Sequence, residues 1–368
     1  MRITYLVAAP GVPVQGPSGA SAHVRGLVGG LRRRHEVRVV AARKTDHRGS
    51  FGEELPEVVE TGVPGWPSWL DGWRELREVR ASRRASWNVI KHARVNPPPE
   101  LVVERHSLFS DAAWRVGDAL GVPWVLEVNA PALLERQRFE RVRKPELARR
   151  WEGDVLRAAP VVVTVSQWLR DWMVREHGCR KVVVVQNGTD ARPGDRSRGR
   201  ATLGLGGDEP AIGFVGSMKP WHGVGRLARV ARATGARLVL LGEQRDPASF
   251  LAEGESLPQD LIWTGHLSGP ALWDAVAALD VGLAPYPESA PPWFCPLKIL
   301  DYRAQGVPVV ASEVGECAAL VGEGGTVVPP DQDEALVEAV REWLGRRVER
   351  QVRGWEQVAE EVVGAAVG

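Results

Sequence analysis

A chain of 368 residues with a net charge of +1 is long enough for two domains and carries no global field that would favour nucleic acid. Its three cysteines form no paired motif, which argues against zinc and fits a reducing compartment. No apolar run approaches the roughly 20 residues of a membrane span, and residues 1–9 fit a buried strand better than a signal peptide. We therefore expect a cytoplasmic protein.

Apolar runs of strand length alternate with helix-length segments along the first half of the chain. Strands are expected at residues 3–8, 37–41, 101–103, 124–128, 161–165 and 182–185. Helices are expected between most of them, for example at residues 20–34, 73–93 and 108–120. Continuous Val-rich runs of this kind are typical of a parallel sheet that is covered on both faces.

The second half repeats this plan. Strands are expected at residues 212–215, 238–241, 261–263, 281–284 and 307–311, with helices at 226–234, 270–279 and 333–344. The polar segment 191–200 contains Pro and Gly and is predicted to be a linker. Residues 341–363 are predicted to be helical. The sequence thus predicts two doubly wound α/β domains, residues 1–190 and 200–347.

The segment 294–310 carries the clearest chemical signal. Pro296 suits a first helical turn, Gly306 suits a helix end, and a short apolar strand follows. Lys298 and Asp301 are three residues apart, so they lie on one helix face near the positive end of its dipole. A lysine at a helix N-terminus forms an anion site, and a carboxylate one turn later can accept two hydrogen bonds from a diol. Phosphate plus ribose indicates a nucleotide; the alternative is an ordinary surface pair.

This segment resembles the donor-binding motif of retaining glycosyltransferases of the GT-B fold, glycosyltransferase family 4. Residues 213–223 resemble the family's strand-to-loop element, whose basic residues hold a diphosphate, and residues 184–190 resemble its entry to the interdomain linker. The resemblance covers nearly the whole chain, with the motifs in the right order. It implies two Rossmann-like domains that face each other across a deep cleft, with a final helix, residues 348–368, packed back on the N-terminal domain.

The resemblance implies a donor site with some departures from the family pattern. Ser217 and Trp293 stand where relatives often carry Arg and Glu, and Asp301 stands where Glu is commonest; Glu288 is an alternative substitute for the missing Glu. Trp293 would stack on the sugar or close the pocket. The expected donor-binding residues are Gly16, Gly19, Gly216, Ser217, Lys219, Phe294, Cys295, Leu297, Lys298 and Asp301.

Further polar residues follow strands of the first domain, where ligands of α/β sheets bind. Asn129 stands where many relatives carry His; Asn cannot shuttle a proton, so it would orient the sugar. Arg105 would bind phosphate or pair with Glu104, and His23 would contact substrate or pack its helix. Ser21 is a candidate N-cap. The expected catalytic residues are Lys219, Lys298, Asn129 and Arg105, and the expected sugar or acceptor contacts are His23, His106, Glu127, Glu288 and Trp293.

Two other functions are less well supported by the sequence. The first strand is not followed by Gly-x-Gly-x-x-Gly, which argues against a dehydrogenase. Residues 331–333 look like a metal-binding Asp-x-Asp, but after two prolines N-capping is the better interpretation. We therefore expect no metal and no cofactor.

We expect transfer of a sugar, with retention, from a nucleotide-diphosphate sugar to a hydroxyl group. UDP is the favoured nucleotide, by family frequency only. The acceptor would be a small molecule, a glycan or a lipid-linked molecule. A nucleotide-sugar epimerase and a non-catalytic sugar-nucleotide-binding subunit are the alternatives. The charged segment 131–151 is interpreted as a surface helix; an acceptor lining or a helix at a membrane surface is the alternative.

Overall fold

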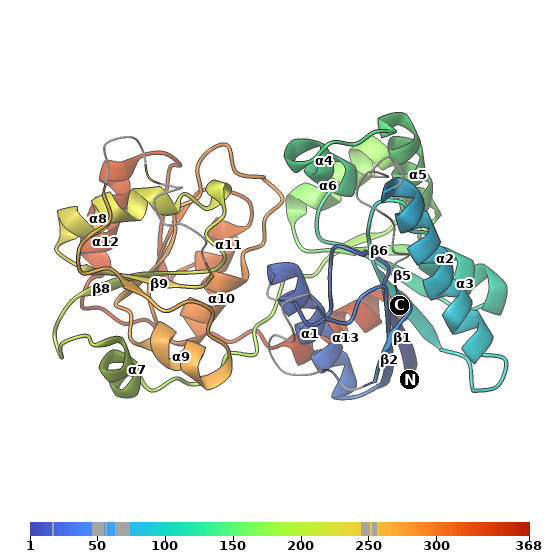
Figure 1. The fold of residues 1–368 in the computed structure, drawn as a ribbon, viewed down its shortest axis with the longest axis horizontal. Coiled ribbons are helices and arrows are strands. Elements are labelled where there is room, and N and C mark those ends of the chain that lie inside the picture. Colours follow the sequence, from blue (N-terminus) through green and yellow to red (C-terminus); the bar gives the residue numbers. More distant parts are fainter. Residues whose placement is uncertain (17, 46–54, 56, 63–73, 244–250, 252–255) are drawn as a thin grey trace. The chain divides into compact units, whose positions relative to one another are not determined.

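The computed structural model describes residues 1–16, 18–45, 55, 57–62, 74–243, 251 and 256–368. Residues 17 and 73, which belong to a predicted loop and a predicted helix, lie outside these ranges. The chain divides into two compact units (Figure 1). Unit 1 comprises Met1–Asn187 with Gly354–Gly368, and unit 2 comprises Gly188–Arg353. The boundary thus falls before the predicted linker, and the returning segment begins at residue 354.

Unit 1 is built on a seven-stranded sheet with the order β3-β2-β1-β4-β5-β6-β7, in which every neighbouring pair is parallel. The inner strands β1, β4, β5 and β6 are almost entirely buried, as their Val-rich runs predict. The strands are β1 Arg2–Val7, β2 Glu36–Ala41, β3 Val58–Glu60, β4 Leu101–Arg105, β5 Trp124–Val128, β6 Val161–Thr164 and β7 Val182–Val184.

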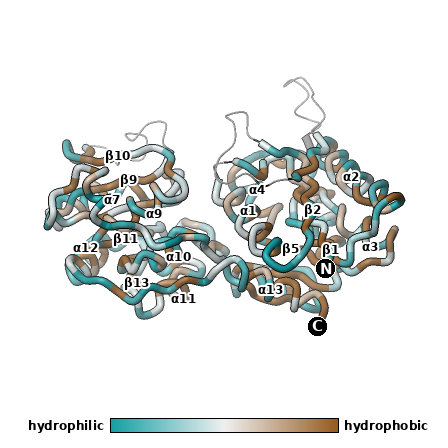
Figure 2. Tube along the Cα trace, turned by 90° about the horizontal axis from the view of Figure 1, so that it is seen from below, coloured by the Kyte–Doolittle hydropathy of each residue, from teal (hydrophilic) through white to brown (hydrophobic). Residues whose placement is uncertain are grey.

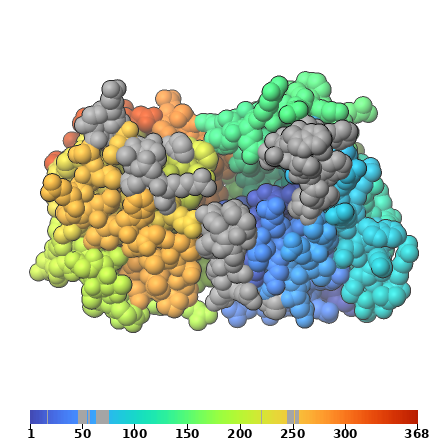
Figure 3. Space-filling model, viewed as in Figure 1, coloured from blue at the N-terminus to red at the C-terminus, as the bar shows by residue number. Residues whose placement is uncertain are grey.

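Helices of unit 1 cover this sheet. They are α1 Gly19–Arg32, α2 Arg74–His92, α3 Ala112–Leu120, α4 Ala132–Phe139, α5 Pro145–Ala158, α6 Gln167–His177 and α13 Trp355–Val367. Ser18, not Ser21, caps α1, because its hydroxyl accepts the backbone N–H of Ser21 at 3.1 Å. In the space-filling view the green surface of α4 and α5 lies at the top of unit 1 (Figure 3).

Helix α13 returns to unit 1 and packs directly on α1. A Cβ on Gly26 would lie 2.1 Å from the Trp355 ring, and one on Gly30 would lie 2.1 Å from the Trp355 carbonyl oxygen. Both glycines are therefore required for the close approach of the two helices. The expectation that a late helix packs on the first domain is met by residues 355–367.

Unit 2 has a six-stranded sheet with the order β10-β9-β8-β11-β12-β13, again parallel throughout. The buried strands appear hydrophobic in the hydropathy view, for example β9 (Figure 2). The strands are β8 Ala211–Val215, β9 Arg237–Leu241, β10 Ile262–Trp263, β11 Val281–Ala284, β12 Val309–Ser312 and β13 Gly325–Val328. The helices are α7 Arg196–Leu203, α8 Leu227–Thr234, α9 Gly269–Ala277, α10 Leu297–Ala304, α11 Cys317–Val321 and α12 Asp333–Trp343, with short 3₁₀ turns at Pro220–His222 and Val224–Arg226.

Two predictions about local structure are wrong. The segment predicted as a linker contains α7, and a Cβ on Gly199 would lie 2.0 Å from the carbonyl oxygen of Asp274 in α9. Gly199 therefore serves close helix packing and not flexibility. The segment 341–363 is not one helix, because α12 ends at Trp343, Gly345 adopts a φ of 75°, and α13 begins at Trp355.

Within the described ranges, no helix combines the length and the apolar character that crossing a bilayer requires.

Candidate active site

Each sheet reverses its strand order at one point. In unit 1 the reversal lies between β1 and β4, and in unit 2 between β8 and β11. Parallel sheets bind ligands beyond the carboxyl ends of the strands at such points, because the loops on either side diverge and leave a crevice.

Two glycines bring backbone together where β8 and β9 end in unit 2. Gly216 and Gly242 have φ values of 137° and 151°, and a Cβ on Gly242 would lie 2.1 Å from the carbonyl oxygen of Gly216. A Cβ on Gly216 would lie 3.5 Å from the Lys298 amine. The loop after β8 therefore lies beside this amine, and side chains there would fill the space around it.

Lys298 is buried, with 8% of its surface exposed. Its Nζ donates to the Tyr286 hydroxyl at 3.2 Å and lies 4.0 Å from the centre of the Phe214 ring. Burial lowers the pKa of Lys298 to about 7, although the nearby Cys317 and Asp301 act in the opposite direction. Within the described part of the chain, no ion pair joins Lys298 to a carboxylate. The amine is thus a buried donor without an anion, which excludes an ordinary surface pair.

Asp301 lies one turn further along α10 and has a different partner. Its Oδ1 accepts a hydrogen bond of 2.6 Å from the Thr189 hydroxyl. Burial raises the pKa of Asp301 to about 6; the charge of Asp190 adds to this, whereas Thr189 and Lys298 oppose it. Helix α10 itself is fixed under the sheet by Tyr302, whose hydroxyl accepts the Val215 N–H at 2.9 Å and donates to the Leu283 carbonyl at 3.2 Å.

His222 was not singled out from the sequence, yet its ring is close to the Lys298 site. The ring centre lies 5.5 Å from that of Phe214 and 5.9 Å from that of Tyr286. Its Nδ1 accepts the backbone N–H of Lys219 at 3.1 Å, so the proton of the neutral ring is on Nε2. Burial lowers the pKa of His222 well below its usual value, and the charge of Lys298 lowers it further. His222 therefore offers a neutral N–H donor.

The side chain of Lys219, in contrast, is exposed, as is that of Ser217. Their predicted roles in phosphate binding remain predictions. The signal that could have pointed to His222 is its place in the same strand-to-loop motif, three residues after Lys219 and directly before Gly223.

The loop before α10 is held by contacts between Phe294 and the segment that contains Gly315 and Glu316. The Phe294 carbonyl accepts the Glu316 N–H at 2.9 Å, and a Cβ on Gly315 would lie 2.4 Å from the same oxygen. Trp293 is buried, whereas Phe294, Cys295 and Leu297 are partly exposed. Pro296 is the N-cap of α10 and not its first residue. Glu288 is exposed, and its N–H donates to Asp331 at 2.8 Å.

The Asp331 to Asp333 segment holds the N-cap of α12, as expected, but the cap residue is Gln332, and its side chain makes no capping hydrogen bond. Asp331 instead binds the Glu288 N–H and lies 3.2 Å from Arg226, and Asp333 pairs with Arg226 and Arg229. The two carboxylates therefore tie α12 to neighbouring segments. Among the described residues, no group of three His, Cys, Asp or Glu side chains has the arrangement of a metal site.

In unit 1, Glu127 is the centre of a buried polar cluster. This carboxylate cluster comprises Glu127, His23, Arg105, Tyr5 and Asn129. Glu127 is 2% exposed, and its Oε1 lies 2.6 Å from His23 Nε2 and 3.2 Å from Arg105 Nη1. Tyr5 and Asn129 also donate to it. Burial alone raises the pKa of Glu127, but His23, Arg105 and Tyr5 together lower it to about 2.

This arrangement shows the protein partners of two residues whose roles the sequence left open. Arg105 pairs with Glu127 and not with Glu104, whose buried carboxylate binds Ser110 and the Ala113 N–H. His23 bridges Glu127 and Asn187, since its Nδ1 lies 2.8 Å from Asn187 Oδ1.

The other predicted residues of unit 1 lie around this cluster or apart from it. His106 is buried against Glu152, with 3.4 Å between Nε2 and Oε1. Gly16 has no room for a side chain, because a Cβ there would lie 2.7 Å from Pro13, whereas Gly19 is exposed beside open space. The structure thus brings His23, Arg105, Glu127 and Asn129 together and turns His106 toward α5.

Two Rossmann-like domains, each with a parallel sheet and covering helices, are the architecture of the GT-B class of α/β proteins. Structural neighbours have this architecture. They include sucrose-phosphate synthase from Thermosynechococcus elongatus, with a TM-score of 0.69, 18% identity and coverage of 100% of this chain and 94% of the other. Another is Anabaena HepE in complex with UDP and glucose, with a TM-score of 0.65, 18% identity and coverage of 100% and 97%. At these identities the likeness shows the fold alone.

Sequence comparison gives the family. The model described as Glycosyltransferase Family 4 matches residues 17–192, and that described as Glycosyl transferases group 1 matches residues 209–346. The two models cover the two halves of the chain, and the chain belongs to glycosyltransferase family 4.

Curated relatives are matched over part of their length. A D-inositol 3-phosphate glycosyltransferase of Mycobacteroides abscessus is 27% identical over 265 residues, which are 67% of this chain and 59% of that protein. A GDP-mannose-dependent alpha-mannosyltransferase of Corynebacterium glutamicum is 29% identical over 196 residues, 51% of this chain and 46% of the relative. The chain therefore spans less than two thirds of the length of these relatives.

Proposed function

We propose that this protein is a retaining glycosyltransferase that moves a sugar from a nucleotide diphosphate to a hydroxyl acceptor. The observation that carries the proposal is the buried Lys298 amine, which has no carboxylate partner among the described residues and lies beside the Gly216 loop, one helical turn from Asp301. In this proposal Lys298 and the α10 N-terminus bind the diphosphate, His222 donates through Nε2–H, and Asp301 accepts the ribose hydroxyls.

The proposed reaction breaks the bond between the sugar C1 and the diphosphate oxygen and forms a bond from C1 to the acceptor oxygen on the same face. The acceptor proton passes to the departing phosphate oxygen, and the products are the glycoside and the nucleoside diphosphate. Negative charge grows on the diphosphate as the bond breaks, so a buried cation there stabilises the transition state more than the ground state. The carboxylate cluster of unit 1 would orient the acceptor side.

UDP is the nucleotide we favour, because it is the commonest in the family that the sequence resembles; GDP is the competing choice, since the mannosyltransferase relative is named as GDP-mannose-dependent. We further propose that transfer needs no metal ion, because Lys298, His222 and the helix end together supply the positive potential. No cofactor beyond the nucleotide sugar is proposed.

A panel of UDP-, GDP- and ADP-sugars tests this function. We expect the sugars of one nucleotide, UDP by preference, to raise the unfolding temperature of the protein, because a ligand that binds only the folded state stabilises it. Release of the nucleoside diphosphate should then rise when an acceptor is added and should persist in excess chelator. Loss of turnover in chelator with recovery on adding magnesium or manganese would contradict metal independence.

The same panel distinguishes two other activities. Formation of an epimeric nucleotide sugar without release would indicate an epimerase, and binding without turnover over a broad acceptor panel would indicate a binding subunit. The structure offers little for the epimerase, since Glu127 is fully engaged and Glu288 is exposed.

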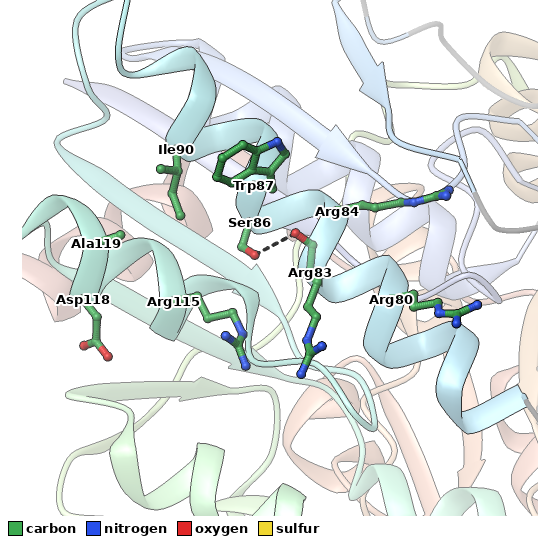
Figure 4. Close-up of a pocket in the computed structure, with 9 residues that line it drawn as sticks. All are labelled: Arg80, Arg83, Arg84, Ser86, Trp87, Ile90, Arg115, Asp118 and Ala119. Atoms are coloured by element: carbon green, nitrogen blue, oxygen red, sulfur yellow. Dashed lines mark hydrogen bonds between the residues drawn. The ribbon is translucent and has the colours of Figure 1, made fainter.

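We propose a cytoplasmic location with peripheral binding to an anionic membrane surface. A groove between α2 and α3 is lined by Arg80, Arg83, Arg84, Trp87, Ile90 and Arg115, with Ser86, Asp118 and Ala119 (Figure 4). Trp87 is 55% exposed, and the Arg94 guanidinium lies 5.3 Å from its ring centre. Exposed Trp flanked by Arg is the composition that favours the headgroup region of a bilayer.

Sedimentation with phosphatidylcholine vesicles, with and without phosphatidylglycerol, tests this location. Replacing Arg83 and Arg84 with Gln should weaken binding to the anionic vesicles about thirtyfold, because each basic residue near the surface contributes about 1 kcal/mol. Arg232→Gln, an exposed arginine of unit 2, serves as the matched control. Equal sedimentation with both vesicle types, or none with either, would overturn the proposal.

A further inference from the structure

The segment that crosses from unit 1 to unit 2 is anchored by Thr189 immediately after the boundary. Thr189 is 5% exposed, and its backbone N–H donates to the Arg353 carbonyl at 2.9 Å, where the chain leaves unit 2 again. Asn187, on the unit 1 side, is held by His23. These contacts anchor the crossing segment, but they do not explain the direction of the Thr189 hydroxyl.

The direction of that hydroxyl follows from its partners. Thr189 Oγ1 accepts the Ala191 N–H at 3.0 Å, and it lies 2.6 Å from Asp301 Oδ1. A backbone N–H can only donate, so the single hydroxyl proton is left for Asp301. The bond therefore runs from Thr189 to the carboxylate, and it is worth most when Asp301 is ionised.

This bond acts on a carboxylate that its surroundings tend to neutralise. Burial and the charge of Asp190 favour the protonated form of Asp301, whereas Lys298 and the Thr189 hydroxyl favour the ionised form. The Tyr302 hydroxyl, another titratable group near Asp301, is hydrogen-bonded to the backbone of β8 and β11. Thr189 occupies Oδ1 and leaves Oδ2 without a partner among the described residues. A ligand diol can reach Asp301 through that oxygen.

We propose that Thr189 is a positioning residue of the donor site: its hydroxyl orients Asp301 and keeps it ionised, so that the second carboxylate oxygen accepts the ribose hydroxyls. The inference rests on the proposed nucleotide-sugar function and adds a residue that lies 112 positions before Asp301 in the chain. A purely structural role for Thr189, as an anchor of the crossing segment, is the competing explanation.

Two variants separate these explanations. Thr189→Val keeps the shape and removes the hydroxyl, and Thr189→Ser keeps the hydroxyl and removes the methyl group. We expect Thr189→Val to weaken UDP binding about tenfold in calorimetry, with turnover at saturating donor unchanged, because one hydrogen bond to a charged group is lost. Thr189→Ser should bind like the wild type.

The pH dependence gives a readout that an anchoring role would not move. If the diol binds the ionised carboxylate, donor affinity falls as the pH drops through the Asp301 pKa of about 6. Removing the Thr189 bond raises that pKa, so the fall should begin at a higher pH in Thr189→Val and at the wild-type pH in Thr189→Ser. In an Asp301→Asn background, Thr189→Val should change donor affinity no further.

Each outcome of this experiment is decisive. Wild-type affinity and an unmoved acid limb in Thr189→Val would overturn the inference and leave the donor site intact. Equal losses in Thr189→Ser and Thr189→Val, or an equal loss in the Asp301→Asn background, would assign Thr189 to anchoring alone. If the wild type binds neither UDP nor GDP, the proposed function is overturned, and the inference with it.

Discussion

Replacing Lys298 with alanine is expected to weaken binding of the nucleoside diphosphate and to slow sugar transfer even more. The amine lies in a buried pocket formed by Phe214 and Tyr286, where a charge on the ligand is poorly screened by water. A hydrogen bond to a charged group contributes about 1.5–3 kcal/mol, which corresponds to about tenfold to a hundredfold. Calorimetric titration and single-turnover rates measure the two effects separately.

The same lysine predicts a pH dependence that the variant should lose. With a pKa of about 7, much of the Lys298 amine is neutral at neutral pH in the unliganded protein. An incoming diphosphate raises that pKa, so binding takes up a proton, and affinity falls as the pH rises above about 7. Titrations in two buffers of different ionisation enthalpy detect the proton uptake directly.

Lys181→Ala, an exposed lysine of unit 1, is the control, and it should bind nucleotide as the wild type does. Lys298→Met keeps the volume of the side chain and checks that the loss is due to the charge. Unchanged affinity in both Lys298 variants would remove the main support for a sugar-nucleotide enzyme.

Replacing Glu127 with glutamine should destabilise unit 1 strongly. The carboxylate lies between His23 and Arg105 in a buried setting, and its removal leaves their polar groups without the compensating charge. Breaking a buried ion pair in this way typically costs about 3–5 kcal/mol. Urea unfolding followed by tryptophan fluorescence measures the loss, and acceptor-dependent turnover should fall with it.

The sign of the pH effect follows from the lowered pKa. Glu127 titrates near 2 in the folded state and near 4.5 when unfolded, so its stabilising contribution is fully present above 4.5 and is lost as the pH falls toward 2. The difference in unfolding free energy between wild type and Glu127→Gln should therefore shrink over that window. Glu146→Gln, which breaks an exposed pair with Arg149, should cost only a few tenths of a kcal/mol. A comparable loss in the two variants would contradict this account.

The strands were predictable because buried parallel strands have continuous apolar sequences, which can be recognised locally. Each predicted strand of the second half, for example, lies within two residues of an observed one. Residues 191–200 show where local reasoning ends. Arg196 donates to the Ala277, Ala278 and Leu279 carbonyls, so a stretch that looks like a linker is held as a helix by a segment some 80 residues later.

The candidate site, too, was predictable from the sequence only in part. The i, i+3 spacing of Lys298 and Asp301 correctly placed them on one short helix, but the spacing could not show that they point to different partners. Lys298 meets two aromatic rings, and Asp301 meets Thr189, which is 112 residues away in sequence. Contacts of this kind depend on the packing of distant segments, and no local pattern encodes them.

The packing of Trp355 on Gly26 and Gly30 has a consequence for the order of folding during synthesis. Residues 188–353 form unit 2 completely and leave the ribosome before residues 354–368, which complete unit 1. Domains generally fold as units while the chain emerges. Unit 2 can therefore complete its folding before unit 1. The face of helix α1 that carries Gly26 and Gly30 stays uncovered until α13 has been synthesised.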